Sequence, residues 1–196
     1  THADLQLKDP SESITIAAKK LLDILRSLPE SSEIVLDGKE SRLTLKAGKS
    51  RFSLQTLPAA DFPKLAETGE AVTSFSLNRK TFKAQLEKVQ YAMANQDIRY
   101  YLNGMLISVA AGKVTAVATD GHRLSFAESN MDGGEAKAEA ILPRKTVAEL
   151  IKLLDDGDAD SSVNVTLKTN QVRFDLGNTE LSSKLIDGKF PDYTKV

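Results

Sequence analysis

The residues best suited to chemistry lie between positions 96 and 125. Near the start of this stretch, Arg99 places a permanent cation beside the rings of Tyr100 and Tyr101. Arginine pairs with phosphate, and tyrosine both stacks on bases and donates a hydrogen bond through its hydroxyl group. The cluster predicts contact with a nucleic-acid backbone. The apolar alternation that follows it leaves an alternative open, in which both tyrosines are strand residues with one ring in the core.

A turn is predicted at Thr119-Asp120-Gly121-His122-Arg123-Leu124, because Gly121 tolerates a positive φ and strand-like alternation lies on both sides. Asp120 and His122 could form an acid–base pair, which would need a metal or a serine nucleophile in a chain without cysteine. No third partner is evident in the sequence. We therefore favour a turn-stabilising role for Asp120.

Two other motifs are incomplete. Gly48-Lys49-Ser50 copies the end of a phosphate-binding loop, but Leu43 stands where that loop requires glycine. Asp156, Asp158 and Asp160 copy the start of a calcium loop, which then lacks the glycine at its sixth position and the glutamate at its twelfth. We therefore expect no metal site, no cofactor and no catalytic activity.

The charge of the chain is unevenly distributed. Apolar residues at helical spacing predict amphipathic helices over 17–28, 78–93 and 143–155. These helices carry a surplus of six positive charges, whereas the rest of the chain carries an excess of seven negative ones, for a net charge of -1. Helices that all faced one partner would present a positive surface to it. The simpler alternative is that these basic residues only solvate the outer helix faces.

Composition indicates a soluble globular chain of 196 residues, 41% of them apolar. The most apolar stretch, 105–111, has seven residues and includes Ser108, whereas a membrane-spanning helix needs about 20. The absence of cysteine excludes disulfides and fits a reducing compartment. Because the chain starts at Thr1 rather than Met, we expect the natural N-terminus to lie upstream.

The predicted elements repeat three times in the order βαβββ. The expected strands are 13–16, 33–37, 42–46 and 51–57, then 72–77, 101–109, 113–119 and 123–128, then 138–142, 163–168, 171–176 and 180–186. Repeats of this length indicate duplicated structural units. Two units side by side give an α+β domain with two helices packed on antiparallel sheet. A polar segment after residue 66 places a domain boundary near residue 69, and Asp132-Gly133-Gly134 is predicted to be a loop.

The strings YYLNGMLI, ATDGHRLS and FPDYTKV, in that order, closely resemble the bacterial sliding-clamp family, the beta subunits of replicative DNA polymerase III. The resemblance covers residues 13–196. It implies the DNA-clamp fold and a cytoplasmic, non-catalytic processivity factor, in which two chains of three domains close a ring around duplex DNA. Residues 1–69 would be the C-terminal half of clamp domain 1. Residues 70–196 would be clamp domain 2 with the start of the connector to domain 3, which is absent.

The resemblance also implies the binding residues. The positions that match DNA contacts are Gln96, Arg99, Tyr100 and Tyr101, with Lys80 and Lys83 facing the channel. A peptide pocket for the polymerase III alpha subunit, the clamp loader and repair polymerases would involve Leu102, Thr119, Gly121, His122, Arg123, Leu124, Pro191, Lys195 and Val196. Lys195 departs from the family pattern, where arginine is common. The alternative for Leu102 and Leu124 is that both are ordinary core residues.

A third surface implied by the resemblance is a head-to-tail homodimer contact through Lys20, Ile24, Lys49, Arg51, Phe52 and Leu54. The residues themselves indicate an edge strand at 51–56, where polar and apolar side chains alternate and another chain could add. Without domain 3, we expect this chain not to close the family's dimeric ring. Two other classes remain open: a metal-dependent hydrolase using Asp120 and His122, and a peptide-binding scaffold to which the helix charges are irrelevant.

Overall fold

The computed structural model describes residues 13–39, 41–63, 70–133, 137–156, 158 and 160–195. The chain divides into two compact units, one within residues 4–65 and the other within residues 66–196. Each unit is described by itself. The three predicted helices and the order of the three βαβββ repeats are confirmed. Among the described residues, no helix is long and apolar enough to cross a membrane.

The first unit contains one repeat. Strand β1 (Ile14–Ile16) precedes helix α1 (Ala18–Ser27), and strands β2 (Ile34–Lys39), β3 (Arg42–Ala47) and β4 (Ser50–Pro58) form a sheet in the order β1-β4-β3-β2. A short 3-10 turn, η1 (Ala59–Asp61), follows β4. Four residues of β3 and β4 make its small core: Leu43, Leu45, Ala47 and Leu54. No residue of α1 is buried, and every residue of β2 is exposed.

The prediction that β4 is an edge strand is wrong for the end of that strand. Within the described residues, β1 pairs with β4 through Ile14 to Pro58 and Ile16 to Thr56. Strand β1 is too short to cover more than these last residues, and Ser50–Gln55 pair only with β3 among the residues that the structure describes. The predicted edge therefore persists only over the first part of β4.

The second unit contains the other two repeats. The second repeat comprises strand β5 (Ala71–Asn78), helix α2 (Arg79–Gln90), the 3-10 turn η2 (Tyr100–Asn103) and strands β6 (Gly104–Ala110), β7 (Lys113–Thr119) and β8 (Leu124–Asn130). After the short strand β9 (Asp132–Gly133), the third repeat comprises strand β10 (Ala138–Pro143), helix α3 (Arg144–Asp155), strands β11 (Ser162–Lys168), β12 (Gln171–Asp175) and β13 (Glu180–Lys184), and the terminal 3-10 turn η3 (Tyr193–Lys195).

The two repeats of this unit exchange their first strands. One sheet has the order β10-β6-β7-β8 and the other β13-β12-β11-β5-β9. Strand β10 of the third repeat thus completes the sheet of the second, and β5 of the second completes the sheet of the third. This reciprocal pairing joins the repeats into one domain, and sequence periodicity did not predict it.

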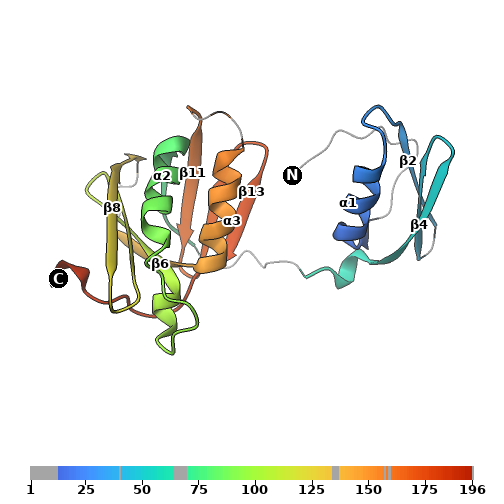
Figure 1. Ribbon diagram of the computed structural model, residues 1–196. Helices are drawn as coiled ribbons and strands as arrows, with labels where there is room; N and C mark the ends of the chain where they lie inside the picture. The colour runs from blue at the N-terminus through green and yellow to red at the C-terminus, as the bar shows by residue number, and fades with distance from the viewer. Residues whose placement is uncertain are drawn as a thin grey trace. The chain divides into compact units, whose positions relative to one another are not determined.

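Helices α2 and α3 lie side by side over the strands of this unit (Figure 1), and their apolar stripes supply its main core. Phe82, Leu86 and Val89 come from α2, and Val147 and Leu150 from α3; all are almost fully buried. Removing such a side chain from water contributes roughly 1.5–3 kcal/mol to the stability of the folded state. The start of α2 is fixed by Asn78, whose side-chain oxygen accepts the backbone N–H of Thr81 at 3.0 Å.

Two local predictions were wrong. The strand expected over 101–109 begins only at Gly104, because Tyr100–Asn103 form the turn η2. Gly104 lies so close to β10 that a Cβ there would be 2.5 Å from the carbonyl oxygen of Leu142. The predicted loop at Asp132-Gly133-Gly134 is also partly strand, since β9 pairs with Phe75 and Ser76; Gly134 lies outside the described residues.

Candidate functional site

The segment between α2 and β6 is a closed loop, here called the 94–103 loop. The backbone N–H of Ala94 donates to the carbonyl of Leu102 at 3.0 Å, which joins the two ends. The side chain of Asn103 crosses the loop, accepting the N–H of Asp97 and donating to its carbonyl, both at 2.9 Å. Gln96 has a positive φ of 58°, as a sharp reversal at that residue requires. The loop is therefore pre-formed by its own polar groups.

Arg99 connects this loop to the predicted turn. Its guanidinium group forms a two-point contact with Asp97, Nε to Oδ1 at 3.0 Å and Nη2 to Oδ2 at 2.8 Å. Nη2 also donates to the carbonyl of Asp120 at 3.3 Å. The hydrogen bond from the Arg99 side chain lowers the pKa of Asp97 to about 2. Arg99 is therefore already paired with a carboxylate, and a phosphate would have to compete for it.

The two tyrosines differ in environment. Their rings meet edge to face with centroids 5.8 Å apart, and Gly188 of the C-terminal segment lies against both residues. Tyr101 is half-buried against the smaller apolar cluster of the unit, which is the alternative considered for one ring, although it belongs to a 3-10 turn rather than a strand. Tyr100 is 57% exposed, so its ring is open to a partner.

Ile98 was not predicted as a candidate surface residue. Its side chain lies between Asp97 and Arg99 and is 94% exposed. The Ile98 side chain points away from the unit, because the neighbouring Asp97 and Arg99 bond to each other within the loop. The only available signal was an isolated apolar residue within a polar loop.

The turn at 119–124 forms as predicted around Gly121, whose φ is +89°. Asp120 Oδ1 accepts the backbone N–H groups of His122 at 3.0 Å and Arg123 at 3.1 Å. These two bonds are the main reason why the pKa of Asp120 is lowered. The turn-stabilising role of Asp120 is therefore visible: Oδ1 accepts two backbone amides of the turn, and Oδ2 accepts Nε of Arg123. Among the described residues, no group of three or more His, Asp or Glu could hold a metal ion.

Arg123 links the turn to the end of α2. Its Nε pairs with Asp120 Oδ2 at 3.0 Å, and its Nη2 donates to the carbonyl of Tyr91 at 2.8 Å. The guanidinium group also lies 5.3 Å from the centre of the Tyr91 ring. Ser125 donates to the carbonyl of Lys88 at 2.7 Å. Carbonyl groups at a helix C-terminus lack intrahelical donors and attract cations. Arg123, which is predicted for a peptide pocket, therefore also binds the end of α2, as does the neighbouring Ser125.

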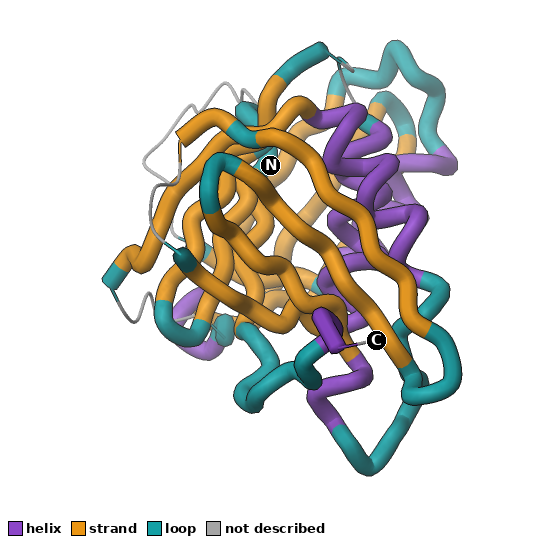
Figure 2. The backbone as a smooth tube through the Cα atoms, turned by 90° about the vertical axis from the view of Figure 1, so that its left-hand side faces the viewer, coloured by secondary structure: helices purple, strands orange, loops and turns teal. Residues whose placement is uncertain are grey.

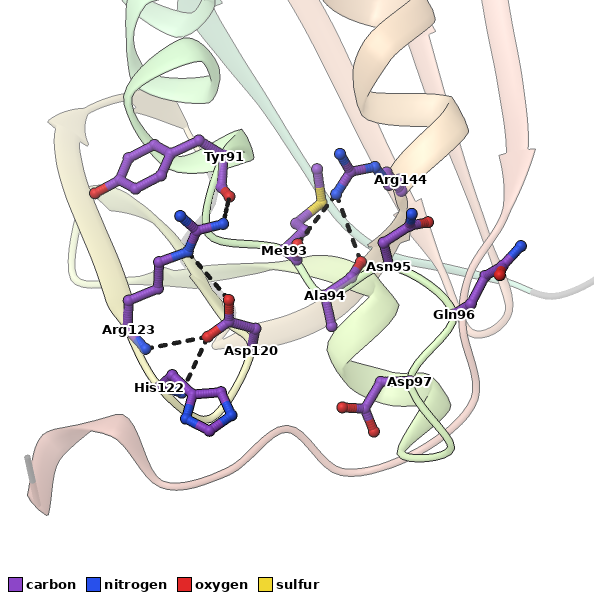
Figure 3. A pocket seen from close by; sticks show the side chains of 10 residues that line it. All are labelled: Tyr91, Met93, Ala94, Asn95, Gln96, Asp97, Asp120, His122, Arg123 and Arg144. Atoms are coloured by element: carbon purple, nitrogen blue, oxygen red, sulfur yellow. Dashed lines mark hydrogen bonds and ion pairs between the residues drawn. The ribbon is translucent and has the colours of Figure 1, made fainter.

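A hollow of about 480 Å³ lies between the 91–97 segment and the turn (Figure 3). Gln96, predicted to contact DNA, and His122 and Arg123, predicted to contact a peptide, all line it. The two predicted sites therefore meet at one place. The complete lining is Tyr91, Met93, Ala94, Asn95, Gln96, Asp97, Asp120, His122, Arg123 and Arg144.

Two apolar residues predicted for the pocket, Leu102 and Leu124, belong to or pack on the smaller core cluster, which includes Ala94 of this lining. Leu102 is only 2% exposed and belongs to the smaller core cluster with Phe190, so it is a core residue by burial. Leu124 is half-buried against the same cluster. Leu124 and the C-terminal segment are thus brought together across a long separation in sequence.

The C-terminal segment folds back over the sheet that carries β8. The ring of Tyr193 packs on Phe126 with centroids 6.1 Å apart, and η3 lies in front of this sheet in Figure 2. Pro191 is exposed, and Lys195 pairs with Asp192 at 3.2 Å. Val196 lies outside the described residues.

The helix cations predicted to face DNA are unequal. Lys80 is exposed on α2. Lys83 pairs with Asp155 of α3 and lies 3.7 Å from Glu87, and the hydrogen bond to Asp155 is the main reason why its pKa is raised. Lys80 is the better candidate for an available positive charge.

The residues predicted for the dimer contact all lie in the first unit. Lys20, Lys49 and Arg51 are exposed, and Ile24 and Phe52 are half-buried. Leu54 is buried in the small core of the unit, so its side chain supports β4 rather than presenting a free surface.

The fold and the motifs together define the class of DNA clamps. Residues 76–192 match the family model described as the DNA polymerase III beta subunit, central domain, and residues 2–66 match the model for its N-terminal domain. The chain belongs to the DNA polymerase III beta subunit family, as the resemblance predicted.

Relatives support this assignment along the whole chain. The Beta sliding clamps of Salmonella typhimurium and Escherichia coli K12 are 41% and 42% identical over 196 residues. These matches cover 99% of this chain and 53% of each relative, so the chain spans about half the length of the curated relatives it matches.

Solved structures agree with the fold. The DNA polymerase III subunit beta of Pseudomonas aeruginosa aligns with a TM-score of 0.90 and 41% identity, over 97% of this chain and 52% of that chain. The sliding clamp of Caulobacter crescentus gives 0.88 and 38%, over 97% and 52%. A Pseudomonas aeruginosa sliding clamp bound to griselimycin gives 0.88 and 42%, again over 97% and 52%.

Proposed function

We propose that this chain is part of a ring-forming processivity clamp, a non-catalytic protein that encircles duplex DNA and tethers a DNA polymerase through a short peptide of that polymerase. The observation that carries the proposal is the position of the 94–103 loop, which Arg99 holds against the 119–124 turn. The loop presents the residues expected to contact DNA, and the turn presents those expected to contact the peptide.

The first unit supports the assignment of residues 1–69 to the second half of clamp domain 1. In the second unit, β11 lies between β12 and β5, and its Val163 and Val165 are buried. Within the described part of the chain, the corresponding strand of the first unit, β2, pairs only with β3, and Ile34 and Leu36 are exposed. An uncovered sheet edge and an uncovered helix are what one half of such a domain presents by itself.

The contacts available to DNA suit a clamp that slides. Contacts to phosphate carry no sequence information, so they allow movement along any sequence. Lys80 offers a charge, and Gln96 and Tyr100 offer exposed polar groups from the 94–103 loop. Arg99 serves this surface chiefly by holding the loop in place, because Asp97 already balances its charge.

The peptide surface is half apolar and half polar. Leu124 and the C-terminal segment form an apolar wall, while His122 and Arg123 border the neighbouring hollow. Such a groove suits an anchor residue of leucine or phenylalanine flanked by polar or acidic residues. The griselimycin complex of the Pseudomonas aeruginosa clamp is consistent with ligand binding in this family.

Retention on circular DNA tests the proposal. A chain carrying all three clamp domains should stay on nicked circular DNA after loading and should slide off the same DNA once it is linearised, because the link is topological. A salt wash separates this behaviour from ordinary binding, since phosphate contacts weaken steeply with salt. Equal loss from circular and linear DNA would refute the ring.

A further inference from the structure

Two arginines occupy equivalent positions in the second and third repeats. Arg79 is the first residue of α2 and Arg144 the first residue of α3, and each is followed by Lys-Thr. The helix of the first repeat begins with Ala18 instead. The pair is therefore specific to the two repeats that make up the second unit.

Arg79 holds the end of α3. Its Nε donates to the carbonyl of Leu154 at 3.2 Å, and its Nη2 donates to the carbonyls of Leu153, at 2.5 Å, and Asp156. The residue is only 6% exposed. These carbonyls have no helical donor of their own, so Arg79 acts as a C-terminal cap supplied by the neighbouring helix.

Arg144 makes a related contact in the opposite direction, from the start of α3 to the segment that follows α2, although the residue itself is exposed. Its Nη1 donates to the carbonyls of Met93 at 3.0 Å and Ala94 at 3.5 Å, just beyond the end of α2 (Figure 3). The N–H of Ala94 closes the 94–103 loop by its bond to Leu102. Arg144 therefore binds the carbonyl of Ala94, the residue whose N–H closes the loop.

The two helix ends lead to different parts of the second unit. The end of α3 leads toward Ser161, whose carbonyl accepts the backbone N–H of Arg79, and away from the predicted binding residues. The end of α2 leads directly into Gln96, Arg99 and Tyr100. The same chemistry thus holds a purely structural junction at one end and the candidate binding loop at the other.

We propose that Arg144 is a positioning residue for DNA binding, which fixes the root of the 94–103 loop through the carbonyls of Met93 and Ala94. This rests on the proposed function for its biological meaning, but the brace itself can be tested without DNA. Arg79 supplies a matched control, because it makes the same kind of contact at the other end of the helix pair.

Amide hydrogen exchange of this chain measures the brace directly. The informative amides are those of Ala94, Asp97, Arg99 and Leu102, each hydrogen-bonded within the loop. In Arg144→Met they should exchange about tenfold faster or more, because a charge-assisted hydrogen bond typically stabilises by that factor. Strand amides of β6 and β7 report global unfolding. Arg79→Met should accelerate those strand amides without a separate effect on the loop.

A lysine variant distinguishes positioning from direct phosphate contact. The Nε and Nη2 atoms of Arg144 have no hydrogen-bond partner among the described residues, so a direct contact is the competing explanation. Arg144→Lys keeps the charge but loses the planar fork. If Arg144 positions the loop, Arg144→Lys should leave loop exchange fast and DNA affinity low in the three-domain clamp. If it contacts phosphate, Arg144→Lys should restore DNA affinity.

The outcomes separate the two proposals. Fast loop exchange in Arg144→Met together with weaker DNA binding, neither of them seen in Arg79→Met at matched stability, supports the positioning role. Loop exchange equal to that of the unchanged chain, or equally fast in Arg79→Met, overturns it. If the unchanged clamp failed to bind DNA, the proposed function would fall, whereas the exchange data would still decide whether Arg144 braces the loop.

Discussion

The contact between Gly121 and Arg99 can be tested by adding a single methyl group. In Gly121→Ala, the new Cβ would lie 3.0 Å from Arg99 Nη1, and the residue would have to keep a φ of +89°. A left-handed backbone costs an alanine roughly 1–2 kcal/mol. Alanine also lowers the entropy of the unfolded chain, and this offsets about 0.4–1 kcal/mol of the cost. We therefore expect a net loss of about 1 kcal/mol in the free energy of unfolding.

Gly177 provides the matched control, because its φ is +90° and a Cβ there would have nothing within 4 Å. Gly177→Ala should lower the free energy of unfolding by a similar amount, measured by urea titration. Only Gly121→Ala should push the flexible end of Arg99 away from Asp97. A carboxyl NMR titration should then show the pKa of Asp97 rising from about 2 toward its ordinary value of 3.8. An unchanged Asp97 pKa in Gly121→Ala, or the same rise in Gly177→Ala, would refute the idea that Gly121 seats Arg99.

Three other predictions concern charge, the pocket and pH. Lys80→Glu in a three-domain clamp should weaken DNA association and reduce the slope of log affinity against log salt concentration by about 0.9 or more. Lys83→Glu should change this slope less, because Lys83 already pairs with Asp155. Equal slopes for all variants would remove α2 from the DNA surface. Leu124→Ala should weaken partner-peptide binding about tenfold, mainly through faster dissociation, and a labelled-peptide titration with unchanged affinity would return Leu124 to the core. Because the folded pKa of Asp97 lies below that of a free carboxyl, its pairing with Arg99 is complete above about pH 4 and is lost as the pH falls to about 2. Amide exchange of the 94–103 loop should therefore accelerate, relative to strand amides, across that window in the unchanged chain, while Asp97→Asn should show fast loop exchange already above pH 4.

The elements of the fold were largely predictable because their signals are local. Asn78 indicated the start of α2, and the apolar spacing of Phe82, Leu86 and Val89 marked the face that is buried. The exchange of β5 and β10 was not predictable in this way, since nothing within a strand identifies its partner. The two-residue strand β9 gave no periodic signal at all, and it exists only because Phe75 and Ser76 lie opposite it.

In the candidate site, too, local features were predictable from the sequence and contacts over long separations were not. The residues themselves predicted a turn at Gly121 and a role for Asp120 in stabilising it, and the geometry agrees. Contacts over long separations in sequence were not predictable, because charge counts treat every cation alike. Lys83 was counted as available, but Asp155 lies beside it across the helix pair. Leu102 is predicted to line a pocket, and its burial shows in addition that it packs in the core.

The structure also alters how the two predicted surfaces relate to each other. The sequence presents them as separate strings, one around Tyr100 and one around His122, whereas Arg99 touches both the loop and the turn. Met93 and Ala94 are fixed by Arg144, and Tyr91 by Arg123, so one short segment receives an arginine from each side. We therefore expect a change in this segment to alter the geometry of the loop and the turn together. Its effects on DNA and on peptide should therefore be measured in the same variants, because a loss in one assay alone cannot be assigned to one surface.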